Sequence, residues 1–309
     1  MLAALAGHAQ DYPNKPIRFV VPYAPGGASD VTARLLGQKM TDAWGQTVAV
    51  DNRAGANGIV ALEFVSKAPA DGYTILMANL GPNAINPAVY SKLPYDPVKG
   101  FAPVTLTTLV PNILVINPYL PARNLKEVFA LAKAKPGQMS YGTGGYGSSN
   151  HLSMELLKSM AGVNITHVPY KGDVPAMIDA MAGQIEMSVP TVVAASPYVK
   201  SGKLRAIAVT SSKRVGSLPD VPTVAAAGVP GFESVSWGGV MAPGGTPATV
   251  VNKLNAEIVR ILRLPEIQER LQALGAEVVG GSPAEFSAYL EAEIAKWSKV
   301  ARAARVKLD

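Results

Sequence analysis

The stretch from Ile17 to Trp44 reads IRFVVPYAPGGASDVTARLLGQKMTDAW, and it predicts a strand, a glycine loop and a helix in succession. Its first five residues, 17–21, have the apolar, β-rich composition of a buried strand. Pro and Gly break regular structure over 22–27, and apolar residues then recur at helical spacing up to Trp44. Such a unit directs free backbone N–H groups and the positive end of a helix dipole at one point, so it can hold an anion without a Lys or Arg.

Strands and helices alternate along the next part of the chain. Residues 47–50 and 73–77 have strand composition, and a helix is expected between them at 59–67. This alternation predicts an α/β fold with a parallel sheet covered on both faces. Ligands of such sheets bind at the carboxyl ends of the strands, which places the loops 23–30 and 79–83 on the same edge.

Two long β-rich runs interrupt this pattern at 101–118 and 232–242. We interpret both as strands that cross between two α/β lobes, because the first is too long for one ordinary strand and contains a proline. The predicted first lobe comprises residues 10–105 and 240–309, and the predicted second lobe, with the crossover strands, comprises 106–239. Two lobes joined in this way can bend about the shared strands.

A second strand, glycine loop and helix begins near Met139. The loop is Gly142-Thr143-Gly144-Gly145-Tyr146-Gly147, and Ser148, Ser149 and Asn150 are all candidates for the helix N-cap. One residue is enough to cap a helix, and this group offers more neutral hydrogen-bond donors than capping needs. We therefore expect the loop to contact a carboxylate of the ligand.

The same loop also matches the dinucleotide fingerprint Gly-x-Gly-x-x-Gly, with Asp173 where a ribose-binding acid could lie. A nucleotide-binding α/β enzyme is therefore an alternative. Against it, the helix begins with Ser-Ser-Asn-His, where the fingerprint needs close apolar packing. His151 and His167 have no acid or second His at metal-ligand spacing, and the chain has neither Cys nor a Gly-x-Ser-x-Gly motif. No catalytic residue, metal or cofactor is predicted.

Bulk composition narrows the class of protein further. Of 309 residues, 48% are hydrophobic and 16% charged, and the net charge is +6. The basic residues are scattered, so no nucleic-acid partner is predicted, and the lack of an apolar run of 18 residues predicts no membrane span. Residues 1–6 are apolar, and Gly7-His8-Ala9 follows as a triplet with small residues at both ends, which indicates that residues 1–9 are the remnant of a secretory signal peptide and that the protein is exported.

Several motifs together resemble one known family. They include Val21-Pro-Tyr-x-Pro-Gly-Gly-x-x-Asp30, Asp71-Gly-Tyr-Thr74, His167-Val-Pro-Tyr-Lys-Gly172 and Leu218-Pro-Asp-Val-Pro-Thr223. They span nearly the whole chain and resemble the Bordetella uptake gene family, the periplasmic solute receptors of tripartite tricarboxylate transporters.

This resemblance implies a type II periplasmic-binding-protein fold that closes on a small carboxylate. It implies a non-enzymatic, monomeric periplasmic receptor that delivers its solute to inner-membrane carrier subunits; a sensory receptor is a further alternative. Neutral groups of 143–150 would hold one carboxylate directly, and the loop 23–30 would hold the other end largely through ordered water. The expected ligand-binding residues are Tyr23, Ala24, Pro25, Gly26, Gly27, Ser29, Asp30, Asn79, Gly81, Thr143, Gly144, Ser148, Ser149, Asn150, Tyr170, Gly172, Asp173 and Thr191.

The chain departs from the family pattern at two positions of the expected cleft. Asp173 replaces a small neutral residue, and Pro190-Thr191 replaces Asp-Asn. Asp173 either faces solvent or meets an amino or hydroxyl group of the ligand, so a ligand with an amine fits better than a plain dicarboxylate. Asp30 is interpreted as a favourable charge at a helix N-terminus. Trp237 is either a packing residue of the hinge or the floor of the cleft.

Overall fold

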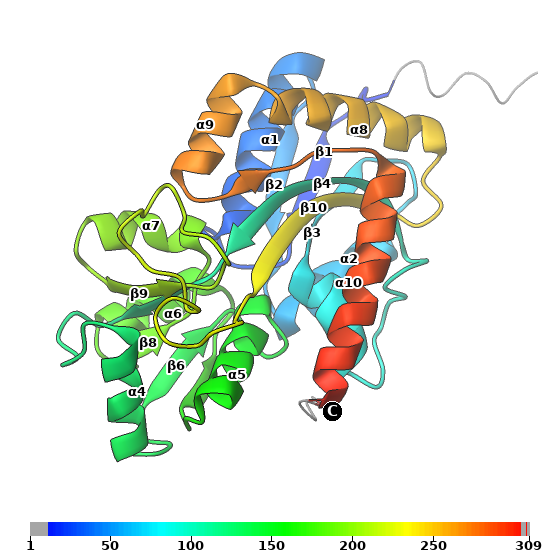
Figure 1. Cartoon of the computed structure of the whole chain (residues 1–309). Helices are drawn as coiled ribbons and strands as arrows, with labels where there is room; N and C mark the ends of the chain where they lie inside the picture. The colour runs from blue at the N-terminus through cyan, green and yellow to red at the C-terminus, as the bar shows by residue number, and fades with distance from the viewer. Residues whose placement is uncertain (1–11, 304–306, 308–309) are drawn as a thin grey trace, which may run out of the picture.

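The computed structural model describes residues 12–303 and 307, and the predicted signal-peptide remnant lies outside this part of the chain. The described residues form two α/β lobes, each built on its own β-sheet (Figure 1). None of the described helices is long and apolar enough to cross a membrane. The predicted fold class is observed, whereas the limits of the two lobes at 10–105, 106–239 and 240–309 stay a prediction.

The sheet of the first lobe has the strand order β11-β4-β10-β3-β1-β2. β1 pairs in parallel with β2 and β3, as the alternating pattern predicts, whereas β10 runs antiparallel to β3 and β4. The strands are β1 (Ile17–Val21), β2 (Val48–Asn52), β3 (Thr74–Asn79), β4 (Phe101–Pro111), β10 (Val235–Pro243) and β11 (Glu277–Val278).

Helices cover both faces of this sheet. Leu36 of α1 and Leu254 of α8 are buried in the core of one face, and Leu62 of α2 and Phe286 of α10 in the core of the other. The helical segments are α1 (Ala28–Trp44), η1 (Ala56–Gly58), α2 (Ile59–Ser66), η2 (Gly81–Ile85), α3 (Asn86–Val89), α8 (Ala248–Leu262), α9 (Pro265–Ala273) and α10 (Pro283–Ala303).

The sheet of the second lobe has the order β7-β6-β8-β5-β9 and is likewise covered on both faces. Leu125 of α4 and Met154 of α5 pack in one core, and Met177 of α6 and Val192 of α7 in the other. The elements are β5 (Ile113–Ile116), α4 (Leu125–Ala134), β6 (Ser140–Thr143), α5 (Ser149–Ala161), β7 (Thr166–Pro169), α6 (Asp173–Met181), β8 (Met187–Ser188), α7 (Val192–Lys200) and β9 (Arg205–Val209).

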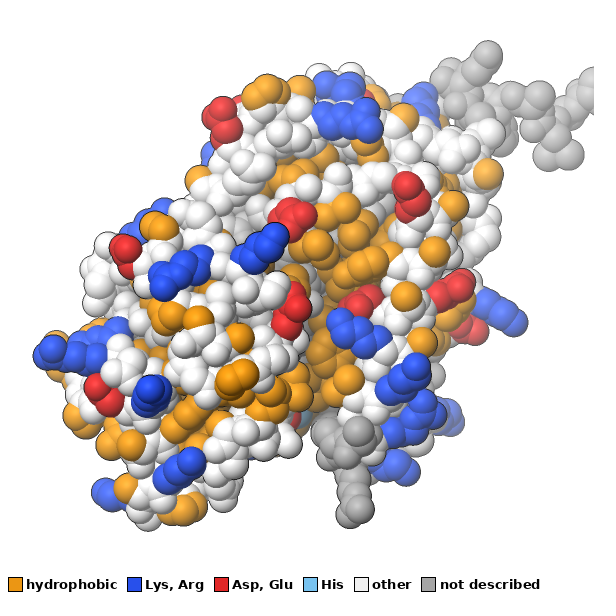
Figure 2. All heavy atoms as spheres, viewed as in Figure 1, with side chains coloured by type: hydrophobic (Ala, Val, Ile, Leu, Met, Phe, Trp, Pro, Cys, Tyr) orange, Lys and Arg blue, Asp and Glu red, His pale blue; other side chains and the backbone are white. Residues whose placement is uncertain are grey.

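The first long β-rich run divides between the two sheets. β4 belongs to the first sheet and β5 to the second, and only Asn112 separates them. β10 lies beside β4 and runs antiparallel to it, so β4 leads into the second lobe and β10 leads back into the first (Figure 1). On the face seen in Figure 2 the surface is hollowed between the lobes, with apolar side chains inside and charged ones around. The lobes therefore meet around two adjacent strands.

Local sequence signals explain several helix ends. Asn124 caps α4 by accepting from the Glu127 N–H at 3.0 Å, and Ser282 forms a capping box with Glu285, whose side chain accepts from the Ser282 N–H at 2.7 Å. The sequence pattern did not predict η2, α3, α7, α9 or β11. α7 contains a proline, Pro197, and such short segments lack a strong periodic pattern.

Candidate functional site

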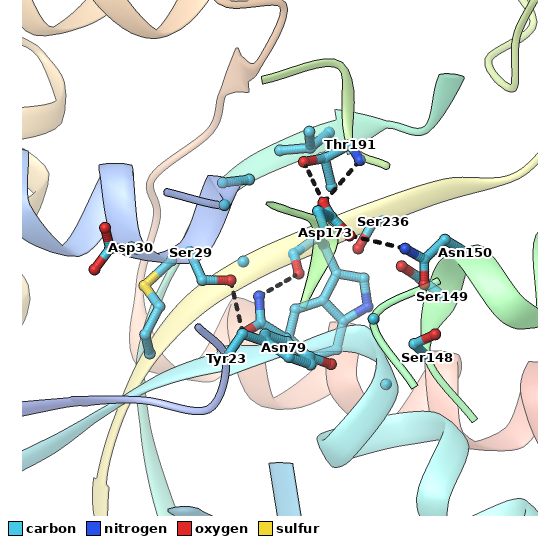
Figure 3. A pocket seen from close by; sticks show the side chains of 18 of the residues that line it. Tyr23, Ser29, Asp30, Asn79, Ser148, Ser149, Asn150, Asp173, Thr191 and Ser236 are labelled. Atoms are coloured by element: carbon cyan, nitrogen blue, oxygen red, sulfur yellow. Dashed lines mark hydrogen bonds between the residues drawn. The ribbon is translucent and has the colours of Figure 1, made fainter. Parts of the chain in front are cut away.

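A cavity of about 50 Å³ lies between the lobes, lined by residues of both (Figure 3). One water molecule needs roughly 10–15 Å³ of such space, so the cavity can hold several waters or the polar end of a small solute. Most of the predicted site residues line the cavity: Tyr23, Ala24, Gly27, Ser29, Asp30, Asn79, Gly81, Gly144, Ser148, Ser149, Asn150, Asp173 and Thr191. The rest of the lining consists of Ala28, Met77, Thr108, Val110, Ser236, Trp237 and Gly238.

The N-terminus of α1 forms the wall on the side of the first lobe. Gly27 is the N-cap and supplies no side chain, so the first N–H groups of the helix are not capped by one. The Ser29 hydroxyl donates to the amide oxygen of Asn79 at 3.1 Å, and the Asn79 amide nitrogen donates in turn to the Trp237 carbonyl at 3.4 Å. This edge therefore offers backbone N–H groups rather than a basic side chain to an anion.

Asp30 is held by the protein itself. Its carboxylate lies 2.9 Å from the Arg34 guanidinium and accepts from the Gly26 N–H and the Asn52 amide. Burial would raise the pKa of Asp30, but these interactions outweigh it and lower the pKa below its usual value. In Figure 3 Asp30 lies apart from the other labelled polar groups. This agrees with its interpretation as a helix N-terminal charge.

The N-terminus of α5 forms a wall on the side of the second lobe. The Ser148 hydroxyl caps the helix by accepting from the His151 N–H at 3.3 Å, and it donates to the Gly145 carbonyl at 2.6 Å. Within the described chain the Ser149 hydroxyl has no hydrogen-bond partner, although Ser149 lines the cavity. One serine is thus used for capping, and the next remains available to a ligand.

Asp173 lines the cavity as the first residue of α6 and is partly buried. One carboxylate oxygen accepts from the Thr191 N–H at 2.9 Å and from the Thr191 hydroxyl at 2.8 Å. The other accepts from the Asn150 amide at 2.8 Å. Burial raises the pKa of Asp173, although these neutral donors act in the opposite direction.

Trp237 is both a packing residue and part of the cavity wall. It is 1% exposed and packs edge-on against Phe286 and Tyr289. Its indole N–H donates to the Glu293 carboxylate at 3.2 Å, and the Trp297 indole donates to the same oxygen at 3.0 Å. The wall formed by β10 is thereby fixed to α10.

The two lobes touch beside the cavity. The Ala24 N–H of the first lobe donates to the Lys171 carbonyl of the second at 3.0 Å. Gly172 approaches so closely that a Cβ atom there would lie 3.2 Å from the Ala24 Cβ. A Cβ on Gly145 would lie 3.8 Å from the Asn57 backbone nitrogen. Glycines therefore permit this close approach.

Five of the predicted site residues do not line the cavity. The Thr143 hydroxyl is engaged with the His167 ring at 2.6 Å, and the Tyr170 hydroxyl donates to Asp179 at 2.7 Å. Pro25, Gly26 and Gly172 belong to the loops where the lobes meet, outside the lining. These side chains and loops support the wall instead of forming it.

The sequence pattern did not reveal the wall formed by the crossover strands. Thr108 and Val110 lie on β4, and Ser236 and Gly238 on β10. Gly238 pairs directly with Thr108 across the two strands. Thr108, Ser236 and Gly238 are polar or small residues inside apolar runs, and this pattern could have indicated a cavity wall. A strand that is buried on both faces would carry larger apolar side chains at these positions.

The two histidines stack on each other behind the α5 loop. The rings of His151 and His167 are 4.1 Å apart, and the His151 Nδ1 accepts from the Gly147 N–H at 3.1 Å. Burial lowers the pKa of His151 to about 4 and that of His167 to about 3, so both rings are neutral near pH 7. The described residues contain no cluster of three potential metal-binding side chains.

Comparison with known proteins gives one consistent result. Residues 32–306 match the model of the tripartite tricarboxylate transporter family receptor. The protein BugT of Bordetella pertussis is 36% identical over 301 residues, covering 97% of this chain and 92% of BugT.

Solved periplasmic binding proteins share the fold along nearly the whole chain. A Rhodopseudomonas palustris protein solved with adipate is 40% identical, with a TM-score of 0.93, and 96% of this chain and 99% of that chain are covered. MatC from Rhodopseudomonas palustris, solved with malate, is 34% identical, with a TM-score of 0.89 and coverage of 94% and 99%. The chain therefore belongs to the tripartite tricarboxylate transporter receptor family and has the periplasmic-binding-protein fold.

Proposed function

We propose that this protein is a periplasmic receptor that binds a small carboxylate and delivers it to the membrane subunits of a tripartite carrier. The observation that carries the proposal is the convergence of the α1 and α5 N-termini on one cavity from different lobes. Helix N-termini bind anions through free N–H groups and the helix dipole. The similar proteins solved with adipate and malate support a carboxylate ligand.

The proposed mechanism is closure of the lobes around the solute. A carboxylate that bridges α1 and α5 interacts with both walls only when the lobes are together, so it stabilises the closed form. The closed form then presents one joint surface of both lobes to the carrier. In this proposal the protein acts as a monomer and catalyses no reaction.

A thermal-shift screen tests the ligand class. The panel contains plain dicarboxylates, acidic amino acids, aromatic carboxylates and nucleotides. A ligand at ~100 times its Kd stabilises the folded state by roughly 2.7 kcal/mol, which raises the midpoint measurably. A shift with one class of carboxylate supports the proposal. A shift with nucleotides alone would favour the nucleotide-binding enzyme, in which the glycine loop 142–147 binds the nucleotide.

Uptake measurements test the proposed partner. Deleting the gene should abolish carrier-dependent uptake of the solute that the thermal screen identifies, and restoring it should recover uptake. Unchanged uptake together with a lost transcriptional response to the solute would favour the sensory receptor instead.

A further inference from the structure

The charges around the cavity are unbalanced. Its lining contains two carboxylates, Asp30 and Asp173, and no Lys, Arg or His. Arg34 lies 2.9 Å from Asp30 and neutralises it. Asp173 has no cation of the described chain within 4.0 Å and receives hydrogen bonds only from the neutral residues Asn150 and Thr191. Asp173 is partly buried, and a partly desolvated carboxylate without a counter-ion is unfavourable, so a ligand cation beside it would be stabilising.

A second acceptor close by has no hydrogen-bond donor among the described residues. Asn150 is 3% exposed, and its amide nitrogen is used by Asp173. The amide oxygen of Asn150 is buried and accepts no hydrogen bond from any described residue. Because buried acceptors are normally paired, this oxygen points to a missing donor.

The two acceptors face the same small space beside Gly144. A Cβ atom built on Gly144 would lie 3.7 Å from a carboxylate oxygen of Asp173 and 3.8 Å from the Asn150 amide oxygen. Gly144 lines the cavity, and the Gly172 Cα lies at 3.7 Å from the same point, so outside the chain neighbours of Gly144 all contacts there are ordinary van der Waals contacts. The space next to it can therefore admit a group of the size of an ammonium.

We propose that this space receives a protonated amino group of the solute, held by the Asp173 carboxylate and the Asn150 amide oxygen. An ammonium has three donors and no acceptor, and therefore suits two adjacent acceptors. The neighbouring α5 N-terminus and the Ser149 hydroxyl would receive a carboxylate of the same solute. The ligand is then an amino-bearing carboxylate, an inference that rests on the proposed receptor function.

Asp173 also limits how many carboxylates the second lobe can accept. Thr191, whose N–H donates to Asp173, is the N-cap of α7, and Asp173 itself begins α6. The Asp173 carboxylate therefore already occupies the N-terminus of α7 and adds a negative charge at the start of α6. The α5 N-terminus remains available to a ligand anion.

Calorimetric titration with matched ligand pairs tests the proposal. Aspartate and succinate share their carbon chain and both carboxylates and differ in the amino group, as do glutamate and glutarate. The parent protein should bind the amino member of at least one pair about tenfold or more tightly than its plain partner. Asp173→Asn should remove this preference, whereas Asp220→Asn, at an exposed residue outside the cavity, should retain it.

Gly144→Ala provides an independent variant. Its methyl group would fill the proposed space, and the Gly144 backbone does not have a left-handed φ, so the substitution is compatible with folding. Gly144→Ala should also lose the preference for the amino ligand.

Three outcomes would overturn the proposal. Equal affinities within each pair, unchanged by Asp173→Asn, would leave the carboxylate receptor intact but remove the ammonium site. If plain diacids bind only at low pH, and Asp173→Asn removes this pH dependence, Asp173 acts as a protonated hydrogen-bond donor to the diacid and not as the acceptor of an ammonium. Failure of every carboxylate to bind would contradict the receptor function itself.

Discussion

Replacing Gly172 by alanine should weaken ligand binding more than its effect on folding explains. Gly172 has φ +150°, so an alanine there is strained whether the lobes are open or closed. The new Cβ would also lie 3.2 Å from the Ala24 Cβ and 3.3 Å from the Ala24 nitrogen, a contact made only while the lobes touch. Overpacking of this kind costs about 1–3 kcal/mol, which corresponds to an affinity roughly 5- to 150-fold lower.

Gly202→Ala is the matched control. Gly202 has φ +71°, and a Cβ built there meets no atom within 4 Å. The Gly202→Ala variant should lose about 1 kcal/mol of stability and retain the ligand affinity of the parent. Urea denaturation measures the stability of both variants, and calorimetric titration measures their affinity. If Gly172→Ala is destabilised but binds ligand as the parent does, the contact of Gly172 with Ala24 is not part of the ligand-bound state.

Two further predictions concern stability. Glu293→Gln should lower the free energy of unfolding by about 1–3 kcal/mol in urea titrations, because the Trp237 and Trp297 indoles would donate to a neutral group instead of a carboxylate; an unchanged midpoint would contradict a charge-assisted role. The lowered pKa values of His151 and His167, about 4 and about 3, make the unfolded chain bind more protons below pH 6.5. The stability that the two neutral rings contribute should therefore be present above pH 6.5 and fall as the pH decreases toward 4. The free energy of unfolding should decrease by on the order of 2 kcal/mol for each ring between pH 7 and 5. A variant with Gln at both positions should show a flatter dependence of stability on pH.

Much of the site could be predicted because its parts are contiguous in the sequence. The loop 23–30 and the loop 142–150 each join a strand to a helix, and both lie at the cavity. Hydrogen-bonding rules for helix N-termini depend on residues three or four positions apart, so the residues around Ser148 were enough to mark it as a candidate cap. The ion pair of Asp30 with Arg34 is of the same local kind.

Other features depend on residues that are distant in the sequence. Asn150 and Thr191 lie 23 and 18 positions from Asp173, and no local rule pairs them. The Thr108 and Gly238 part of the wall exists only because β4 and β10 pair in one register. Register between distant strands is fixed by packing of the whole sheet, which a single sequence does not display.

The sequence by itself determined the two loops that are proposed to bind an anion, the alternation of most strands and helices and the presence of an acid at position 173. Periodicity and capping are properties of neighbouring residues, so they are visible in the sequence directly. The tertiary structure decided that Asp173 lines the cavity without a counter-ion and that Thr143 and Tyr170 face other partners. The physical reason is that burial and electrostatic pairing depend on which distant segments pack together.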